Sequence, residues 1–155
     1  AKYWVCKTAP GFIYEAMECL GGNGYVEESM LPRLYREAPV NAIWEGSGNV
    51  MCLDVLRALR RDELAGLFDR VSREADLPAA EAANWDAASG AGARETVGRL
   101  AVLAGAAALR ASAPPAVAEA FVRTRLVKPH GALYGATTLD AATIETLLQR
   151  ALPEA

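Results

Sequence analysis

The sequence has few of the residues that build metal and redox centres. One histidine, His130, occurs among 155 residues, and it has no cysteine, histidine or acidic partner nearby in the sequence. The three cysteines do not fall at metal-ligand spacing, and an odd number without a disulfide framework indicates a reducing, cytoplasmic setting. We therefore expect no bound metal and no catalytic role for His130. The cysteines are Cys6, Cys19 and Cys52.

The sequence also lacks an excess of basic residues and any long apolar run. A net charge of −3 and a pI of about 5.2 leave no overall electrostatic signature for nucleic acid. The run from Leu100 to Leu109 is Ala/Gly-rich and falls well short of the roughly 18 residues that a membrane span needs. We also see no signal peptide.

No stretch shows the two-residue alternation of a half-buried strand, whereas apolar residues recur at helical spacing in several places. The fold class is therefore predicted to be all-α, a helical bundle with a helical extension. Composition changes near Asp62, beyond which the chain is rich in alanine. We thus expect a first domain over residues 1–61 and an Ala-rich helical extension over residues 62–155.

Glycine and proline divide the helical pattern. The predicted helices cover residues 1–20, 31–37, 48–61, 63–75, 79–88, 94–111, 116–126 and 139–152. Pro10-Gly11 predicts a kink or break in the first, and residues 21–29 and 128–137 are expected to be loops. Residues 40–45 are expected to be extended or irregular. Ser47 is placed to cap the helix that runs to about Arg61, whose predicted buried stripe is Cys52, Leu53, Leu56 and Leu59.

Glu45 is the sharpest candidate for chemistry. It follows apolar Ile43 and Trp44, and Gly46 and Gly48 allow a bulky ligand to approach the backbone. A carboxylate in a dry pocket has a raised pKa, which suits a general base. From local chemistry alone, however, a surface glutamate near a helix N-terminus is the better interpretation. Trp44 is similarly expected in the core rather than stacked on a cofactor.

Other polar and glycine positions have both a structural and a functional interpretation. The amides of Gly21-Gly22-Asn23-Gly24 could meet a phosphate or a flavin edge, but a helix end followed by a turn explains the same residues. Ser47 and Asn49 could contact a cofactor, although capping is sufficient for Ser47. Arg57, with Arg60 and Arg61, could meet phosphate or DNA, or could be a solvated helix end.

Three segments in a fixed order resemble the C-terminal helical domain of the acyl-CoA dehydrogenases. They are Glu18–Tyr25 (ECLGGNGY), Pro32–Ala38 (PRLYREA) and Ile43–Ser47 (IWEGS). The amino-acid sequences of residues 23–29 and 45–57 resemble the AidB-like, adaptive-response branch of that family more closely still. The resemblance is strong over about residues 1–59 and weak beyond.

The resemblance implies an FAD-dependent oxidoreductase that forms a homotetramer and oxidises an acyl-CoA. Glu45 matches the base that removes the substrate α-proton, Ser47 and Asn49 match positions that touch the flavin, and Gly21 and Gly22 match glycines that approach the FAD of a neighbouring subunit. Many members carry Gln at Glu18, and Thr and Gln at Ser47 and Asn49, so these positions depart from the common pattern.

The AidB-like branch adds a second implied activity, since its members are thought to bind double-stranded DNA and protect it during alkylation stress. Arg57 matches a position implicated in that binding, although the acidic balance of residues 61–155 argues against strong DNA binding. A third alternative is a helical assembly module in which Glu45 only shapes an interface. The chain begins inside a helical pattern without a methionine, so we expect a fragment that alone binds little FAD and has no dehydrogenase turnover.

Overall fold

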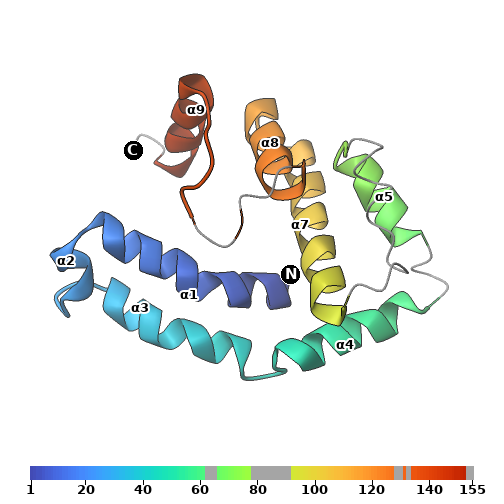
Figure 1. Ribbon diagram of the computed structural model, residues 1–155, viewed down its shortest axis with the longest axis horizontal. Coiled ribbons are helices and arrows are strands. Elements are labelled where there is room, and N and C mark those ends of the chain that lie inside the picture. Colours follow the sequence, from blue (N-terminus) through green and yellow to red (C-terminus); the bar gives the residue numbers. More distant parts are fainter. Residues whose placement is uncertain (62–65, 78–91, 128–130, 132–133, 153–155) are drawn as a thin grey trace. The chain divides into compact units, whose positions relative to one another are not determined.

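The computed structural model describes residues 1–61, 66–77, 92–127, 131 and 134–152. Within these ranges the chain is built from helices without a strand, which confirms the all-α prediction (Figure 1). The chain divides into two compact units. Unit 1 is Ala1–Ala65 with Ala91–Gly98, and unit 2 is Gly66–Gly90 with Arg99–Ala155. None of the described helices is both long enough and apolar enough to span a membrane.

Unit 1 is organised around its first helix. It contains α1 (Lys2–Cys19), α2 (Gly22–Tyr25), α3 (Leu31–Glu37), the 3-10 helix η1 (Ala38–Ala42), α4 (Gly48–Leu59) and the start of α7 (Ala93–Ser112). α1 packs against α2, α3, η1 and α4, and Figure 1 shows α1 and α3 running side by side. Helix α3 has the bounds that the sequence predicts.

α1 continues through Pro10 as one helix, so a break at Pro10-Gly11 is excluded. Pro10 has no N–H to donate and removes one hydrogen bond from the ladder. The helix is nevertheless held along its length by four other elements, and such packing supplies most of a helix's stability in a protein. Tertiary contacts therefore offset the local cost of the proline.

Two segments expected to be irregular are helical. Gly22–Tyr25 forms the single turn α2, and Ala38–Ala42 forms η1. Ala38 keeps helical torsions (φ −52°, ψ −42°) although Pro39 follows, which is disfavoured but not forbidden. Because Ala38 and Ala42 are both buried and η1 packs on α1, burial outweighs the local preference.

Only part of the predicted stripe of α4 is buried. Cys52 is fully buried, and Leu56 and Leu59 are half-buried, but Leu53 is 53% exposed. Val50 is exposed as well. The prediction for Leu53 is therefore wrong for this chain, because α4 packs on α1 with one side only and presents a second apolar side outward.

Unit 2 has a continuous core in which alanines pack beside valines and leucines. It contains α5 (Leu67–Glu74), most of α7, α8 (Pro115–Val122), the π-helical turn η3 (Arg123–Val127) and α9 (Ala141–Ala151). The buried cluster is Val71, Ala75, Leu103, Ala106, Val122 and Leu126. Alanines here let helices approach closely, so the Ala-rich composition has a packing explanation.

The helices predicted at 63–75, 94–111 and 139–152 correspond to α5, α7 and α9, with shifted ends. The one predicted at 116–126 is α-helical only to Val122, after which η3 widens the winding. The predicted helix at 79–88, His130 and half of the expected loop at 128–137 lie outside the described residues.

Candidate functional site

Residues 43–46 form a tight turn that carries Glu45. The carbonyl of Val40 accepts hydrogen bonds from the amides of Ile43 (2.9 Å) and Trp44 (3.0 Å). On the other side, Lys2 Nζ donates to the carbonyls of Trp44 (2.9 Å) and Glu45 (3.1 Å). Glu45 has a φ of +51°, uncommon for a residue with a side chain. The turn is therefore held in a strained conformation by contacts from η1 and from the start of α1.

The Glu45 side chain and its apolar neighbours are exposed. Ile43 is 67% exposed and Trp44 59%, so the expectation that Trp44 lies in the core is wrong. Glu45 itself is also exposed. The described residues of this chain thus present the carboxylate on the surface and do not supply the dry pocket that a raised pKa requires.

The start of α4 lies directly after this turn. Ser47 is the N-cap residue, as predicted, but its hydroxyl makes no capping hydrogen bond. Asn49 Oδ1 accepts a hydrogen bond of 2.8 Å from Arg94 Nε. Gly48 is buried, and a β-carbon there would lie 2.9 Å from Lys7 Cε and 3.4 Å from Arg94 Nη2. Two cationic side chains therefore flank this helix start.

Sequence reasoning missed Lys7 and Arg94, because they reach Gly48 and Asn49 from 41 and 45 positions away in the chain. No local pattern signals such a contact. The structure thus brings Glu45, Ser47 and Asn49 together at one end of α4 and adds two basic side chains to them.

Gly21 and Gly22 lie at the other end of α1. Gly21 has a φ of +57° and ψ of −139°, a conformation that favours glycine, and neither residue has an atom within 4 Å of an added β-carbon. Lys2, which holds the Glu45 turn, begins α1, and Gly21 follows its last turn. An 18-residue helix is about 27 Å long. The two glycines and Glu45 are therefore not brought together within this chain.

Gly24, in the same glycine-rich segment, has the strictest steric requirement of the described glycines. A β-carbon at this position would lie 2.2 Å from the carbonyl oxygen of Met17, a distance that no side chain tolerates. The repeated glycines around it were the available signal. α2 can pack on α1 only because residue 24 has no side chain.

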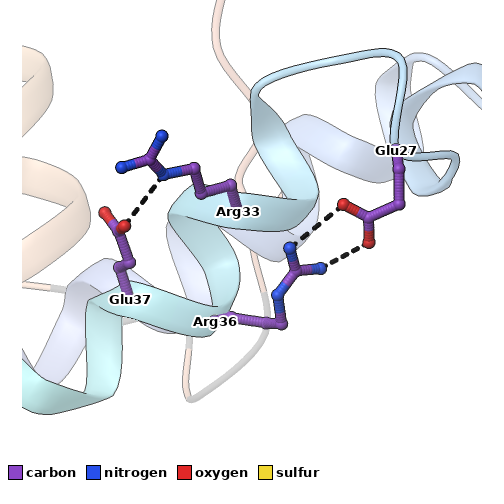
Figure 2. A network of polar contacts seen from close by, with 4 residues as sticks. All are labelled: Glu27, Arg33, Arg36 and Glu37. Carbon is purple, nitrogen blue, oxygen red and sulfur yellow. Dashed lines mark hydrogen bonds and ion pairs between the residues drawn. The ribbon is translucent and has the colours of Figure 1, made fainter.

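A surface hollow of about 450 Å³, which no sequence motif indicates, lies close to Gly24, since Met17 and Tyr25 are among the residues that line it. Arg36 donates from both terminal nitrogens to the Glu27 carboxylate, at 2.5 and 3.0 Å, and Arg33 Nε bonds Glu37 at 2.9 Å (Figure 2). The Arg36 hydrogen bonds lower the pKa of Glu27 and raise that of Arg36. The hollow is lined by Met17, Tyr25, Val26, Glu27, Glu28, Pro32, Tyr35 and Arg36.

Arg57 is not part of the Glu45 cluster. Its Nη1 bonds the Oδ1 of Asp54, three residues earlier in the chain, at 2.6 Å on the exposed side of α4. Arg57 stands nine residues beyond Gly48, or about 13 Å along the helix. Arg60 and Arg61 are exposed at its end. Any role of Arg57 is therefore separate from chemistry at Glu45.

The cysteines have three different environments. Cys52 is fully buried, Cys6 is half-buried and Cys19 is exposed, and all three are free thiols. Burial raises the pKa of Cys52, and burial likewise raises that of Tyr3, whose side chain hydrogen-bonds it. Cys52 thus serves the packing of α4 on α1. No cluster of three or more potential metal ligands occurs among the described residues.

Comparison with known proteins gives the same family over the first part of the chain. Residues 1–60 match the family model "Acyl-CoA dehydrogenase, C-terminal domain". The "Putative acyl-CoA dehydrogenase AidB" of Escherichia coli (strain K12) is 64% identical over 72 residues, 46% of this chain and 13% of that protein. "Acyl-CoA dehydrogenase family member 11" of Caenorhabditis elegans is 47% identical over 62 residues, 40% of this chain and 10% of that protein.

A third relative extends the range of the family. The "Short-chain specific acyl-CoA dehydrogenase, mitochondrial" of Bos taurus is 38% identical over 55 residues, 36% of this chain and 13% of that protein. The matched stretches thus span only about an eighth of these relatives or less. The predicted family resemblance is confirmed over residues 1–60, which match the acyl-CoA dehydrogenase C-terminal domain, with AidB among the similar proteins.

Proposed function

We propose that this chain contributes the base of an FAD-dependent acyl-CoA dehydrogenase and that Glu45 removes the substrate α-proton. The observation that carries this proposal is the Glu45 turn. Its backbone is held by Lys2 and Val40, whereas its carboxylate is exposed and available to a second molecule. A positioned carboxylate on a fixed backbone is what general-base catalysis requires.

The exposure of the Glu45 carboxylate also indicates what other parts of the protein must supply. A glutamate in water has a pKa of roughly 4.3, too low for an effective base at neutral pH, and desolvation raises it. Ile43 and Trp44 offer exposed apolar surface on the same turn. We infer that other parts of the complete protein cover this surface, exclude water from Glu45 and complete the acyl-CoA cleft.

The residues around the turn fit a flavin. The Ser47 hydroxyl makes no capping bond, so this hydroxyl and the first backbone amides of α4 can donate hydrogen bonds to a ligand. The side-chain amide nitrogen of Asn49 can also donate, because only its Oδ1 is used, as the acceptor for Arg94. We propose that Ser47 and Asn49 contact FAD in this way. When bound, FAD supplies the hydride acceptor for the substrate β-carbon.

The glycines fit a second flavin contact. Gly21 and Gly22 leave open space around their backbones, and α1 separates them from Glu45 by about 27 Å. Contact with the FAD of a neighbouring subunit, rather than the same one, agrees with that separation. A homotetramer with these glycines at its interfaces is therefore part of the proposal, as is a division into residues 1–61 and a helical extension of residues 62–155.

The proposal is tested with Glu45→Gln in the full-length, FAD-loaded protein. Gln has the shape of Glu but cannot accept the proton, so flavin reduction by acyl-CoA should slow by roughly 10²-fold or more while FAD stays bound. Glu45→Asp is the matched control and should keep part of the rate. Stopped-flow bleaching of the flavin absorbance measures both, and an unchanged rate in Glu45→Gln removes Glu45 as the base.

The remaining expectations concern the cellular setting, the isolated fragment and DNA binding. Three free cysteines agree with a reducing, cytoplasmic setting. The fragment alone should bind little FAD and show no turnover, because most of the proposed pocket belongs to parts outside it. DNA binding through Arg57 stays a prediction that no described contact favours, since the guanidinium is already paired with Asp54.

A further inference from the structure

Unit 2 contains a pocket outside the stretch that matches the dehydrogenase family. It has a volume of about 240 Å³ and is lined by residues of α8 and η3, of the segment 135–139 and of α9. The lining residues are Ala120, Phe121, Thr124, Arg125, Gly135, Thr137, Leu139 and Leu147.

The floor of this pocket is set by the core of unit 2. Val122 and Leu126 point into the buried cluster, which places Ala120, Phe121, Thr124 and Arg125 along the pocket side of the same winding. Phe121 is backed by α7, since a methyl group added at Gly105 would lie 3.5 Å from its Cζ. The π-helical turn displaces the backbone here, and such turns are frequent at functional sites.

The residues that line the pocket are mainly apolar but include a charged side chain. Phe121, Leu139 and Leu147 are apolar, and Arg125 is the single charged side chain among the described residues that line the pocket. The nearby carboxylate of Asp140 is engaged elsewhere, because it accepts bonds from Thr143 N (2.9 Å) and Thr143 Oγ1 (2.8 Å) as the cap of α9. The Thr124 hydroxyl likewise donates to the Ala120 carbonyl at 2.8 Å.

We propose that this pocket binds a small amphipathic carboxylate, with its apolar chain against Phe121, Leu139 and Leu147 and its carboxylate on Arg125. The volume of 240 Å³ lies just below the roughly 300 Å³ at which pockets for drug-sized ligands begin, so it suits a short chain of a few carbons. Arginine favours carboxylates through its forked donors. The proposal is independent of the Glu45 chemistry and stands or falls separately.

The test is a titration of the 155-residue chain with hexanoate, hexan-1-ol and hexylammonium, followed residue by residue in ¹H–¹⁵N correlation spectra. Hexanoate should bind best and shift the amides of residues 120–125 and 135–147. Arg125→Gln should weaken hexanoate roughly threefold to fivefold, the range of an exposed ion pair, and leave hexan-1-ol unchanged. Arg150→Gln, which removes the same charge from an exposed site on α9, is the matched control and should change nothing.

A second variant tests the apolar wall. Leu147→Ala should weaken hexanoate and hexan-1-ol alike, with an unchanged circular dichroism spectrum as the check on folding. Equal binding of hexylammonium and hexanoate, or equal effects of Arg125→Gln and Arg150→Gln, would overturn the assignment. Shifts confined to residues outside the pocket would do so as well.

Discussion

The two units of this chain differ in how far their apolar residues are buried. Among the described residues, fourteen large apolar side chains lie exposed in unit 1 and three in unit 2. Unit 2 buries Leu103, Ala106 and Ala75 completely inside one cluster, whereas unit 1 leaves Ile43, Trp44 and many others at the surface. Exposed apolar side chains that form a contiguous patch are typical of interaction surfaces. Unit 2 therefore has a core of its own, whereas the exposed apolar residues of unit 1 make it a candidate interaction surface.

The family match falls on the same side of this difference. Residues 1–60, which match the acyl-CoA dehydrogenase domain, belong to unit 1. The candidate base, Glu45, directly follows two of the exposed apolar residues of this unit, Ile43 and Trp44. The unit with the more exposed apolar residues is therefore also the one that carries the candidate base.

The largest expected effect tests whether unit 2 depends on its core. Leu103→Ala removes a completely buried side chain and should destabilise unit 2 by about 2–5 kcal/mol. Leu53→Ala, at an exposed leucine of unit 1, should change stability by less than about 0.5 kcal/mol. Urea denaturation of the 155-residue chain measures both. Similar losses in the two variants would mean that unit 1 buries Leu53 in solution and that the contrast is not real.

The next effect concerns the tightest contact of unit 1. Gly24→Ala places a β-carbon against the Met17 carbonyl and should destabilise the packing of α2 on α1 by about 1–3 kcal/mol. Gly22→Ala meets no atom within 4 Å and is the matched control. Thermal unfolding followed by circular dichroism separates them. If Gly22→Ala keeps the stability of the chain but abolishes FAD binding in the full-length protein, Gly22 is needed for cofactor binding rather than for folding.

The smallest effect is a pH dependence in unit 2. The backbone N–H and hydroxyl of Thr143 lower the pKa of Asp140 from its ordinary value of 3.8. A folded pKa below the unfolded one stabilises α9 above pH 3.8, and this contribution is lost as the pH falls through the folded value. Asp140→Asn should keep the cap but lose its acid sensitivity, whereas Asp140→Ala should lose the cap at every pH.

Amide hydrogen exchange of residues 141–146, measured between pH 3 and pH 6, follows this cap directly. The wild-type chain should lose protection of α9 at the acid end beyond the intrinsic change in exchange rate. An identical pH profile in wild type and Asp140→Asn would show that the carboxylate does not contribute.

Helices with strong periodicity were predictable from the sequence, because their apolar spacing and their glycine and proline ends are local signals. α3, the extent of α7 and the position of Ser47 at the start of α4 follow from these signals. Pro10 and Ala38 show the limit of local rules. Pro10 is unfavourable in a helix because it lacks an N–H, and Ala38 because Pro39 follows it, yet each is helical because α1 and η1 pack together.

The sequence by itself determined the helical class and the family resemblance of residues 1–60, and it selected Glu45 as the candidate base, since each rests on residue types and their spacing. Only the tertiary structure decided that Glu45, Trp44 and Leu53 lie exposed, that Lys2 holds the Glu45 turn, and that Arg94 reaches Asn49. The physical reason is range. Spacing reports the face on which a side chain lies, whereas burial and long-range contacts depend on which other element, within this chain or beyond it, comes to cover that face.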